Sequence, residues 1–280
     1  ANELFLSIKK QHPNWGVSPY LDFNHYLEVQ KPEKVVWFNE EIKKLKPSEF
    51  ISTTEGYLSS VYNDYFYDYD STYGFLHRII SEDIGWYTKI IKELAKTKEN
   101  CDNLKDFFVS QVENIDIPIN LLPVVLDSIH KMSNNKITKN EIRAYNRLIK
   151  QIDVRENKEI LEKIRNRVQY LNTQSIALES NDFINNDYVN TAINNPYGMI
   201  TEFFLIDLSQ EQKEKTVSQN NIPERYIKYF ESVCCRNDFR GELGKTILGM
   251  NFSWLLYLMP QFVEKTLAPC LNENNKGLWF

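Results

Sequence analysis

EIRAYNRLIKQI, residues 141–152, is the stretch of this sequence that indicates the fold most clearly. Its apolar residues recur at spacings of three and four, which places them on one face of an α-helix. Arg, Asn, Lys and Gln fill the other positions, as in a helix that buries one face and exposes the other. The pattern returns in NKEILEKIRNRVQYL, residues 157–171. The apolar positions of the first stretch are Ile142, Tyr145, Leu148, Ile149 and Ile152.

Outward from these stretches, helical spacing continues along most of the chain, and strict alternation of apolar and polar residues is rare. TKNE, residues 138–141, fits a capping box at the start of the first helix. Short connections favour antiparallel neighbours. We predict helices over 2–10, 32–45, 48–68, 73–97, 102–114, 119–132, 139–152, 156–178, 182–193, 196–209, 223–235, 238–258 and 261–271.

The sequence therefore predicts an all-α fold. Helix pairs recur about every 35–45 residues, a period typical of HEAT-like repeats, so we expect an irregular α-solenoid, with a large multi-helix bundle as the alternative. The most polar boundary is SNNKITKN, residues 133–140. It divides the chain into an N-terminal helical part, 1–135, and a C-terminal helical part, 136–280.

Composition limits the partners. A net charge of −5 gives no basic face for nucleic acid. The longest apolar run, FSWLLYLM at residues 252–259, is far shorter than the roughly 20 residues of a membrane span. The four cysteines form no metal-binding spacing, and two of them are adjacent in sequence, so reduced thiols and a cytoplasmic location are expected. The first residue is Ala and the last seven read NNKGLWF, which suggests a piece of a longer protein.

No motif in the sequence names a reaction. The four histidines lack metal-ligand spacing, and no nucleophile motif or phosphate-binding loop is present. RGELGK, residues 240–245, has the wrong glycine spacing for a phosphate loop, and we expect its glycines to allow close helix packing. We predict no catalytic residue, no metal and no cofactor in this chain.

VYNDYFYDYDSTYGF, residues 61–75, is the most unusual stretch because tyrosines alternate with aspartates. Tyrosine gives rigid contact area at low entropic cost, which favours a partner-binding surface. The acidic neighbours would then select a basic partner. The alternative is an ordinary helix with one face in the core. The candidate binding residues are Tyr62, Tyr65, Tyr67, Asp68, Tyr69, Asp70 and Tyr73.

NNPYG, residues 194–198, interrupts the helical pattern before MITEFFLIDL. Asn195 suits an N-cap, and Pro196 suits the first position of a helix. Gly198 would allow a neighbouring helix to approach closely, and Glu202 would touch a neighbouring helix or a cap. We interpret the segment as a structural elbow between two helices.

DYVNTAINNPYGMITEFFL, IPERYIKYFESV and RGELGKTILGMNFSWLLYLMPQFVEKTLAPCL carry a family resemblance over about residues 185–280. Together they resemble an uncharacterised helical domain near the C-terminus of bacterial anti-phage defence proteins. Several of those proteins have an N-terminal sirtuin-type domain that cleaves NAD. The resemblance implies that any NAD chemistry lies outside this chain, and it transfers no catalytic residue.

Three hypotheses follow. The first is a non-catalytic recognition or scaffold module of a larger defence protein, which binds a phage protein or regulates its own effector domain. The second is a small helical enzyme with an acidic and tyrosine-rich site near residues 62–77. The third is an oligomerisation domain.

Overall fold

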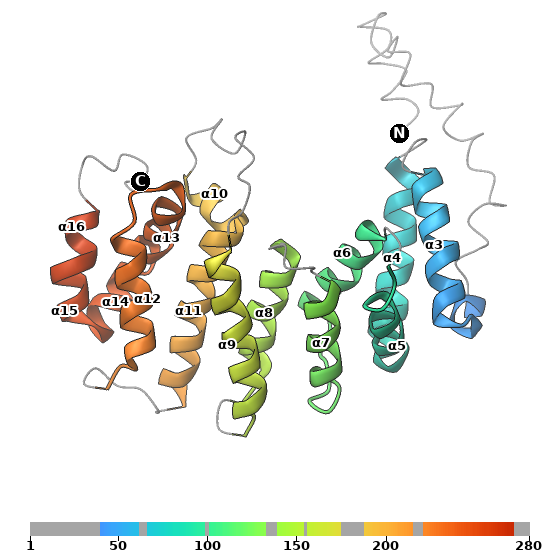
Figure 1. The fold of residues 1–280 in the computed structure, drawn as a ribbon, viewed down its shortest axis with the longest axis horizontal. Coiled ribbons are helices and arrows are strands. Elements are labelled where there is room, and N and C mark those ends of the chain that lie inside the picture. Colours follow the sequence, from blue (N-terminus) through green and yellow to red (C-terminus); the bar gives the residue numbers. More distant parts are fainter. Residues whose placement is uncertain are drawn as a thin grey trace, which may run out of the picture.

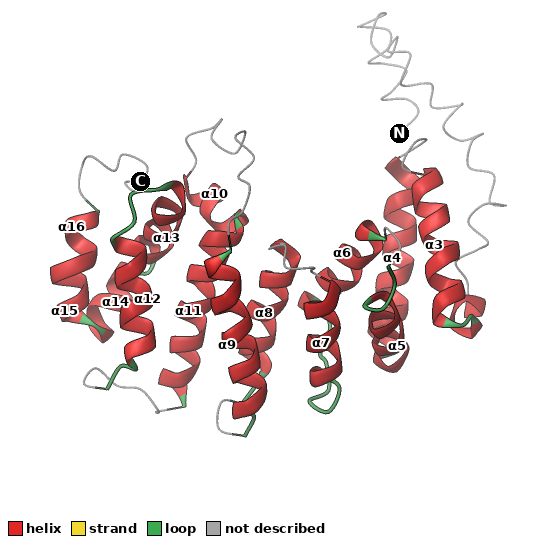
Figure 2. Cartoon of the chain, viewed as in Figure 1, coloured by secondary structure: helices red, strands yellow, loops and turns green. Residues whose placement is uncertain are grey.

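The computed structural model describes residues 40–61, 66–98, 101–132, 139–153, 156–174, 188–214 and 221–271. Within these ranges every regular element is a helix, which confirms the all-α prediction (Figure 2). The N-terminal helices α3 to α7 lie at one end of the long axis, α8, α9 and α11 lie in the middle, and α14 to α16 lie at the other end (Figure 1). Such a row of helices is the arrangement expected of an irregular solenoid.

The N-terminal elements are η2 (Glu40–Lys44), α3 (Pro47–Val61), α4 (Phe66–Glu82), α5 (Ile84–Leu94), α6 (Asp102–Ser110), η3 (Gln111–Glu113) and α7 (Leu122–Met132). Aromatic side chains hold them together. Tyr87 stacks on Phe108 with ring centroids 5.8 Å apart, and its hydroxyl donates to the Phe108 carbonyl at 2.9 Å. Phe50 meets Trp86 edge to face at 5.1 Å. All four side chains belong to the buried core.

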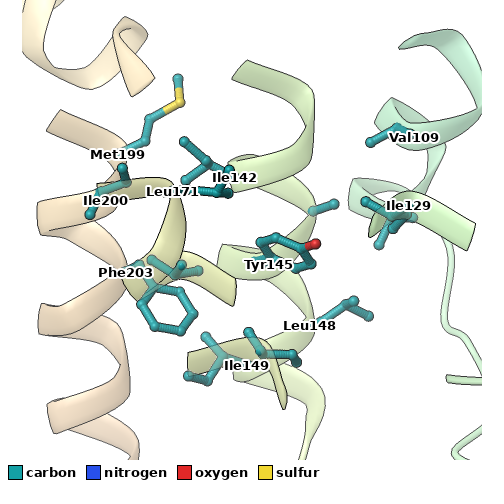
Figure 3. Packing of buried hydrophobic residues seen from close by; sticks show 14 of the residues in the cluster. Val109, Ile129, Ile142, Tyr145, Leu148, Ile149, Leu171, Met199, Ile200 and Phe203 are labelled. Atoms are coloured by element: carbon teal, nitrogen blue, oxygen red, sulfur yellow. The ribbon is translucent and has the colours of Figure 1, made fainter. Parts of the chain in front are cut away.

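The middle of the row is formed by α8 (Lys139–Gln151) and α9 (Lys158–Thr173). Helix α8 packs on α6 and η3 on one side, and on α9 and α11 (Pro196–Lys213) on the other. Its apolar stripe is fully enclosed by these neighbours (Figure 3). The face that the sequence pattern predicts is thus the buried face.

Helices α8 and α9 also share a buried polar cluster. The Glu141 carboxylate, fully buried, accepts hydrogen bonds from the Tyr145 hydroxyl and from Arg167 Nε, both at 2.9 Å. Burial, and next the neighbouring Glu141, raises the pKa of Tyr145 well above its ordinary value, so the hydroxyl keeps its proton and donates. Thr138, the partner of Glu141 in the predicted capping box, lies outside the described residues.

The C-terminal elements are α10 (Tyr188–Asn194), α11, α12 (Glu224–Cys234), α13 (Phe239–Met250), α14 (Phe252–Leu258), α15 (Pro260–Phe262), the π-helical turn η4 (Val263–Leu267) and α16 (Ala268–Cys270). Helix α11 lies among them with 11 buried residues, from Tyr197 to Glu211. Helices α8, α10, α12 and α13 all contact it. This enclosure explains why α11 is apolar around much of its circumference.

Two predicted helices are divided in the structure. The predicted helix 73–97 breaks at Asp83, whose carboxylate accepts from the Trp86 amide at 2.7 Å and caps α5. The predicted helix 238–258 breaks at Asn251, between α13 and α14. The predicted helix 2–10 lies outside the described residues, and of 32–45 only the 3₁₀ turn η2 is described.

The predicted boundary between 1–135 and 136–280 falls before α8. Across it, α8 packs directly on α6 and η3, and buried hydrophobic residues from both parts form one cluster. The division into two parts stays a prediction. Within the described ranges, no helix is long and apolar enough to cross a bilayer.

Candidate functional site: a groove between helices α9 and α12

The tyrosine- and aspartate-rich candidate site cannot be built from the described side chains. Tyr62 and Tyr65 lie outside the described residues, and from 66 to 73 the structure describes the helical backbone of α4 but not the side chains. His77, one turn beyond, has its Nδ1 2.6 Å from the Gln111 side-chain oxygen. Both interpretations of residues 62–73 therefore stay predictions.

The elbow residues lie where α10 meets α11. Asn195 is the N-cap of α11, and its side chain accepts from the Tyr197 amide at 3.0 Å, with Pro196 next in the first turn. A Cβ atom on Gly198 would lie 1.9 Å from the Ala192 carbonyl oxygen, so glycine is required for this close approach. The absence of a side chain at Gly198 thus allows α10 and α11 to approach closely.

Glu202 lies further along α11 and reaches the neighbouring helix α8. Its Oε2 accepts from Asn146 Nδ2 at 3.3 Å, while the same Asn146 amide group lies 3.3 Å from the Met199 carbonyl. Asn146 is buried, so these hydrogen bonds satisfy a donor that would otherwise be costly to bury. Glu202 thus fixes the α8–α11 contact.

A groove of about 770 Å³ opens between α9 and α12. Helix α11 lies between α9 and α12. Two contacts show that α9 runs antiparallel to α11. At the middle of α9, Arg165 binds Glu211 at the end of α11. Past the end of α9, the Gln174 carbonyl accepts from the Tyr197 hydroxyl at the start of α11, at 3.2 Å.

Two further contacts give the direction of α12. Arg225, at its start, binds the same Glu211, and Tyr229, one turn later, lies 3.0 Å from the hydroxyl of Thr201 near the start of α11. Helix α12 is therefore also antiparallel to α11. Hence α9 and α12 run parallel to each other on either side of α11 (Figure 1). Side chains of α9 and α12 line the groove.

The side chains on the two walls differ in charge. The α9 wall carries only uncharged polar and tyrosine side chains: Asn166, Gln169, Tyr170, Asn172 and Thr173. The α12 wall carries charged side chains as well: Glu224, Arg225, Lys228, Tyr229 and Ser232. On each wall the residues recur at helical spacing, so each set faces the groove along about two turns.

A buried ionic network fixes one end of the groove. Arg165 binds Asp207 through two parallel hydrogen bonds of 2.9 and 2.7 Å, and Glu211 at 2.7 Å. Asp207 is fully buried. Burial alone lowers the pKa of Arg165, but the hydrogen bonds and charge of Asp207 outweigh it, so the net shift is upward. These ion pairs tie α9 to α11.

Arg225 extends this network to α12. Its guanidinium binds Glu211 and donates to the Tyr226 hydroxyl at 3.1 Å. Burial, and next the charges of Asp207 and Glu211, raises the pKa of Tyr226, so the phenol stays protonated. Since breaking a buried charged pair is strongly destabilising, the network holds the three helices in fixed relative positions.

An aromatic stack supports the groove further along. The Tyr229 ring lies on Phe204 of α11 with centroids 3.8 Å apart and an angle of 24° between the ring planes. Burial raises the pKa of the Tyr229 hydroxyl, which stays protonated beside Thr201. The wall of α12 is thus anchored by both a charged and an aromatic contact.

The site offers donors and acceptors for binding but no activated nucleophile. Among the described side chains there is no group of three or more His, Cys, Asp and Glu residues arranged to hold a metal ion. Burial, and next the neighbouring Cys270, raises the pKa of Cys234 to about 12, which keeps it a thiol at neutral pH.

Sequence reasoning did not find this groove. Residues such as Asn166 and Gln169 occupy the polar face of an amphipathic helix, which the pattern assigns simply to solvent. The opposite wall lies more than 50 positions further along the chain. One feature of the sequence could have indicated the groove. The exposed face of α9 near Asn166 carries side-chain amides at positions where charged side chains are more usual.

No protein-family model, curated protein or solved structure matches this chain. The fold and the groove therefore define the class of this protein by its helical architecture alone. The described part is an all-α row of amphipathic helices with a groove between two parallel helices.

Proposed function

We propose that this chain is a non-catalytic recognition module that binds a protein partner. The observation that carries the proposal is the groove between α9 and α12, whose walls rest on a buried ionic network. A row of stacked helices offers an extended surface, which suits binding of another polypeptide. A surface held in one geometry loses little entropy when it binds.

The resemblance over residues 185–280 gives this proposal a biological setting. In that setting the module belongs to a larger bacterial defence protein with a sirtuin-type effector domain. It then binds either a phage protein or the effector domain itself. All of α11, α12 and the α12 wall of the groove fall inside the resembling region.

A binding experiment tests the proposal. The chain is immobilised, and individually purified structural proteins of a tailed phage and a recombinant sirtuin-type domain are passed over it in biolayer interferometry. We expect at least one protein to bind with a Kd of about 10 μM or tighter, the range of specific transient complexes. Free chain in solution should compete with the immobilised chain.

Two results would contradict the proposal. One is that no protein in the panel binds while circular dichroism shows the immobilised preparation to be helical. The other is that the isolated chain itself converts NAD to nicotinamide, since the proposal assigns it no chemistry.

A further inference from the structure

We propose that the groove between α9 and α12 holds an extended peptide segment of the partner and recognises it mainly through its backbone amides. This inference rests on the proposed recognition function and specifies which ligand the site takes. Four observations carry it: the length of the walls, the chemistry of the α9 wall, the compensated charges of the α12 wall, and the anchoring of both walls.

The walls match each other in length. The lining residues of α9 run from Asn166 to Thr173, and those of α12 run from Glu224 to Ser232. Seven and eight steps at about 1.5 Å per residue make the walls about 10 and 12 Å long. An extended chain rises about 3.3 Å per residue, so about three residues lie between the walls.

The α9 wall carries the groups that pair with peptide bonds. Each side-chain amide of Asn166, Gln169 and Asn172 has both an NH₂ donor and a carbonyl acceptor, which complement the C=O and N–H of a peptide group. Within the described part of the chain, no hydrogen bond to another residue engages these three side chains. They are available to a ligand.

The charges of the α12 wall are already paired. Lys228 Nζ lies 3.1 Å from Glu224 Oε1, and the Arg225 guanidinium binds the buried carboxylate of Glu211. A ligand therefore meets little net charge in the groove. This disfavours nucleic acid, whose affinity comes from phosphates neutralised by cations. It favours recognition of a neutral polar group such as the peptide bond.

The anchoring of both walls favours an extended ligand over an adaptable one. Arg165 and Arg225 share Glu211, and Tyr229 stacks on Phe204, so the spacing of α9 and α12 is set before binding. A preformed slot of fixed length pays less entropy on binding. A linear backbone uses such a slot better than a globular surface does.

The test starts from a phage-displayed library of random dodecapeptides selected on the full chain. Selected peptides are synthesised with a fluorophore, and their Kd is measured by fluorescence polarisation. The test variant combines N166A, Q169A and N172A. The matched control combines N237A and Q261A, which remove exposed amides of the same two kinds outside the groove.

We expect binding to weaken at least tenfold in the triple variant and less than twofold in the control. Because recognition is through the backbone, N-methylation of one of the central peptide bonds should weaken binding at least tenfold. Alanine substitution of single peptide side chains should weaken it less than threefold. Raising NaCl from 50 to 500 mM should change the Kd less than threefold, because few charges are involved.

The inference is overturned if no more displayed peptide is recovered on the chain than on a blank surface, if the triple variant binds the peptides as tightly as the control variant does, or if alanine substitutions in the peptide weaken binding and N-methylation does not. A strong salt dependence would point to charge recognition and would overturn it too. Circular dichroism verifies that both variants remain helical. If a partner protein binds the triple variant normally, the recognition function stands and only the groove assignment fails.

Discussion

Replacing Gly198 with alanine should destabilise this protein, although the same replacement stabilises most helices. Gly198 lies in the first turn of α11, where the chain passes the end of α10. A Cβ atom there would lie 1.9 Å from the carbonyl oxygen of Ala192 and 2.7 Å from its carbon. These are backbone atoms, so no side-chain rotation relieves the overlap, and α10 must move away from α11.

The magnitude comes from two opposing effects. Alanine favours the helix over glycine by up to about 1 kcal/mol. Overpacking costs about 1–3 kcal/mol, and we take the upper end because a backbone segment has to shift. The net loss is about 2 kcal/mol. At about 2–4 °C per kcal/mol for a domain of this size, Tm should fall by about 4–8 °C.

Gly74 provides the matched control because nothing lies within 4 Å of a Cβ atom placed there. Gly74→Ala should therefore gain the helix preference alone and raise Tm by about 2–4 °C. Thermal unfolding followed by circular dichroism at 222 nm measures both variants. If Gly198→Ala raises Tm as Gly74→Ala does, the close approach of α10 and α11 is refuted.

Three further predictions concern the polar contacts. Asp207→Ala should lower the free energy of unfolding in urea by about 3–5 kcal/mol, because it leaves the Arg165 charge buried without its bidentate partner. The hydrogen bonds of Arg236 lower the pKa of Asp238 to about 2; the ion pair therefore stabilises the fold above about pH 4 and loses this effect as pH falls through 2. The stability gap between wild type and Asp238→Asn should accordingly narrow from pH 5 to pH 2. Tyr229→Phe should cost about 1 kcal/mol in urea unfolding, because it removes one buried hydrogen bond and keeps the aromatic stack.

Each of these has a control or a contrary outcome. Glu159→Ala removes a partner from the exposed pair with Lys163 and should leave the urea midpoint almost unchanged, unlike Asp207→Ala. A constant gap between wild type and Asp238→Asn from pH 5 to pH 2 would show that the ion pair does not stabilise the fold. If Tyr229→Phe lowers the free energy of unfolding as much as Tyr229→Ala does, the hydroxyl contributes more to stability than the ring.

The buried faces were predictable from local patterns, and the helix breaks were less so. In α8, the residues of the predicted apolar stripe from Ile142 to Ile149 are all buried. Asp83 was not recognised as a helix start because it lies between two helical segments of continuous apolar spacing. The buried Glu141 was interpreted as a capping residue, although its carboxylate also accepts from Arg167, a residue of the next helix.

The spacing of apolar residues along the chain by itself determined that this protein is built from amphipathic helices. The period of an α-helix is local, so the order of apolar and polar residues within one segment is enough to reveal it. The tertiary structure alone decided that α9 and α12 face each other across α11, with Arg165 and Arg225 meeting on one carboxylate. That arrangement depends on contacts between residues of different helices, 14 positions apart for Arg225 and Glu211 and 46 positions apart for Arg165 and Glu211. Such contacts arise from packing of whole helices, and no local period encodes them.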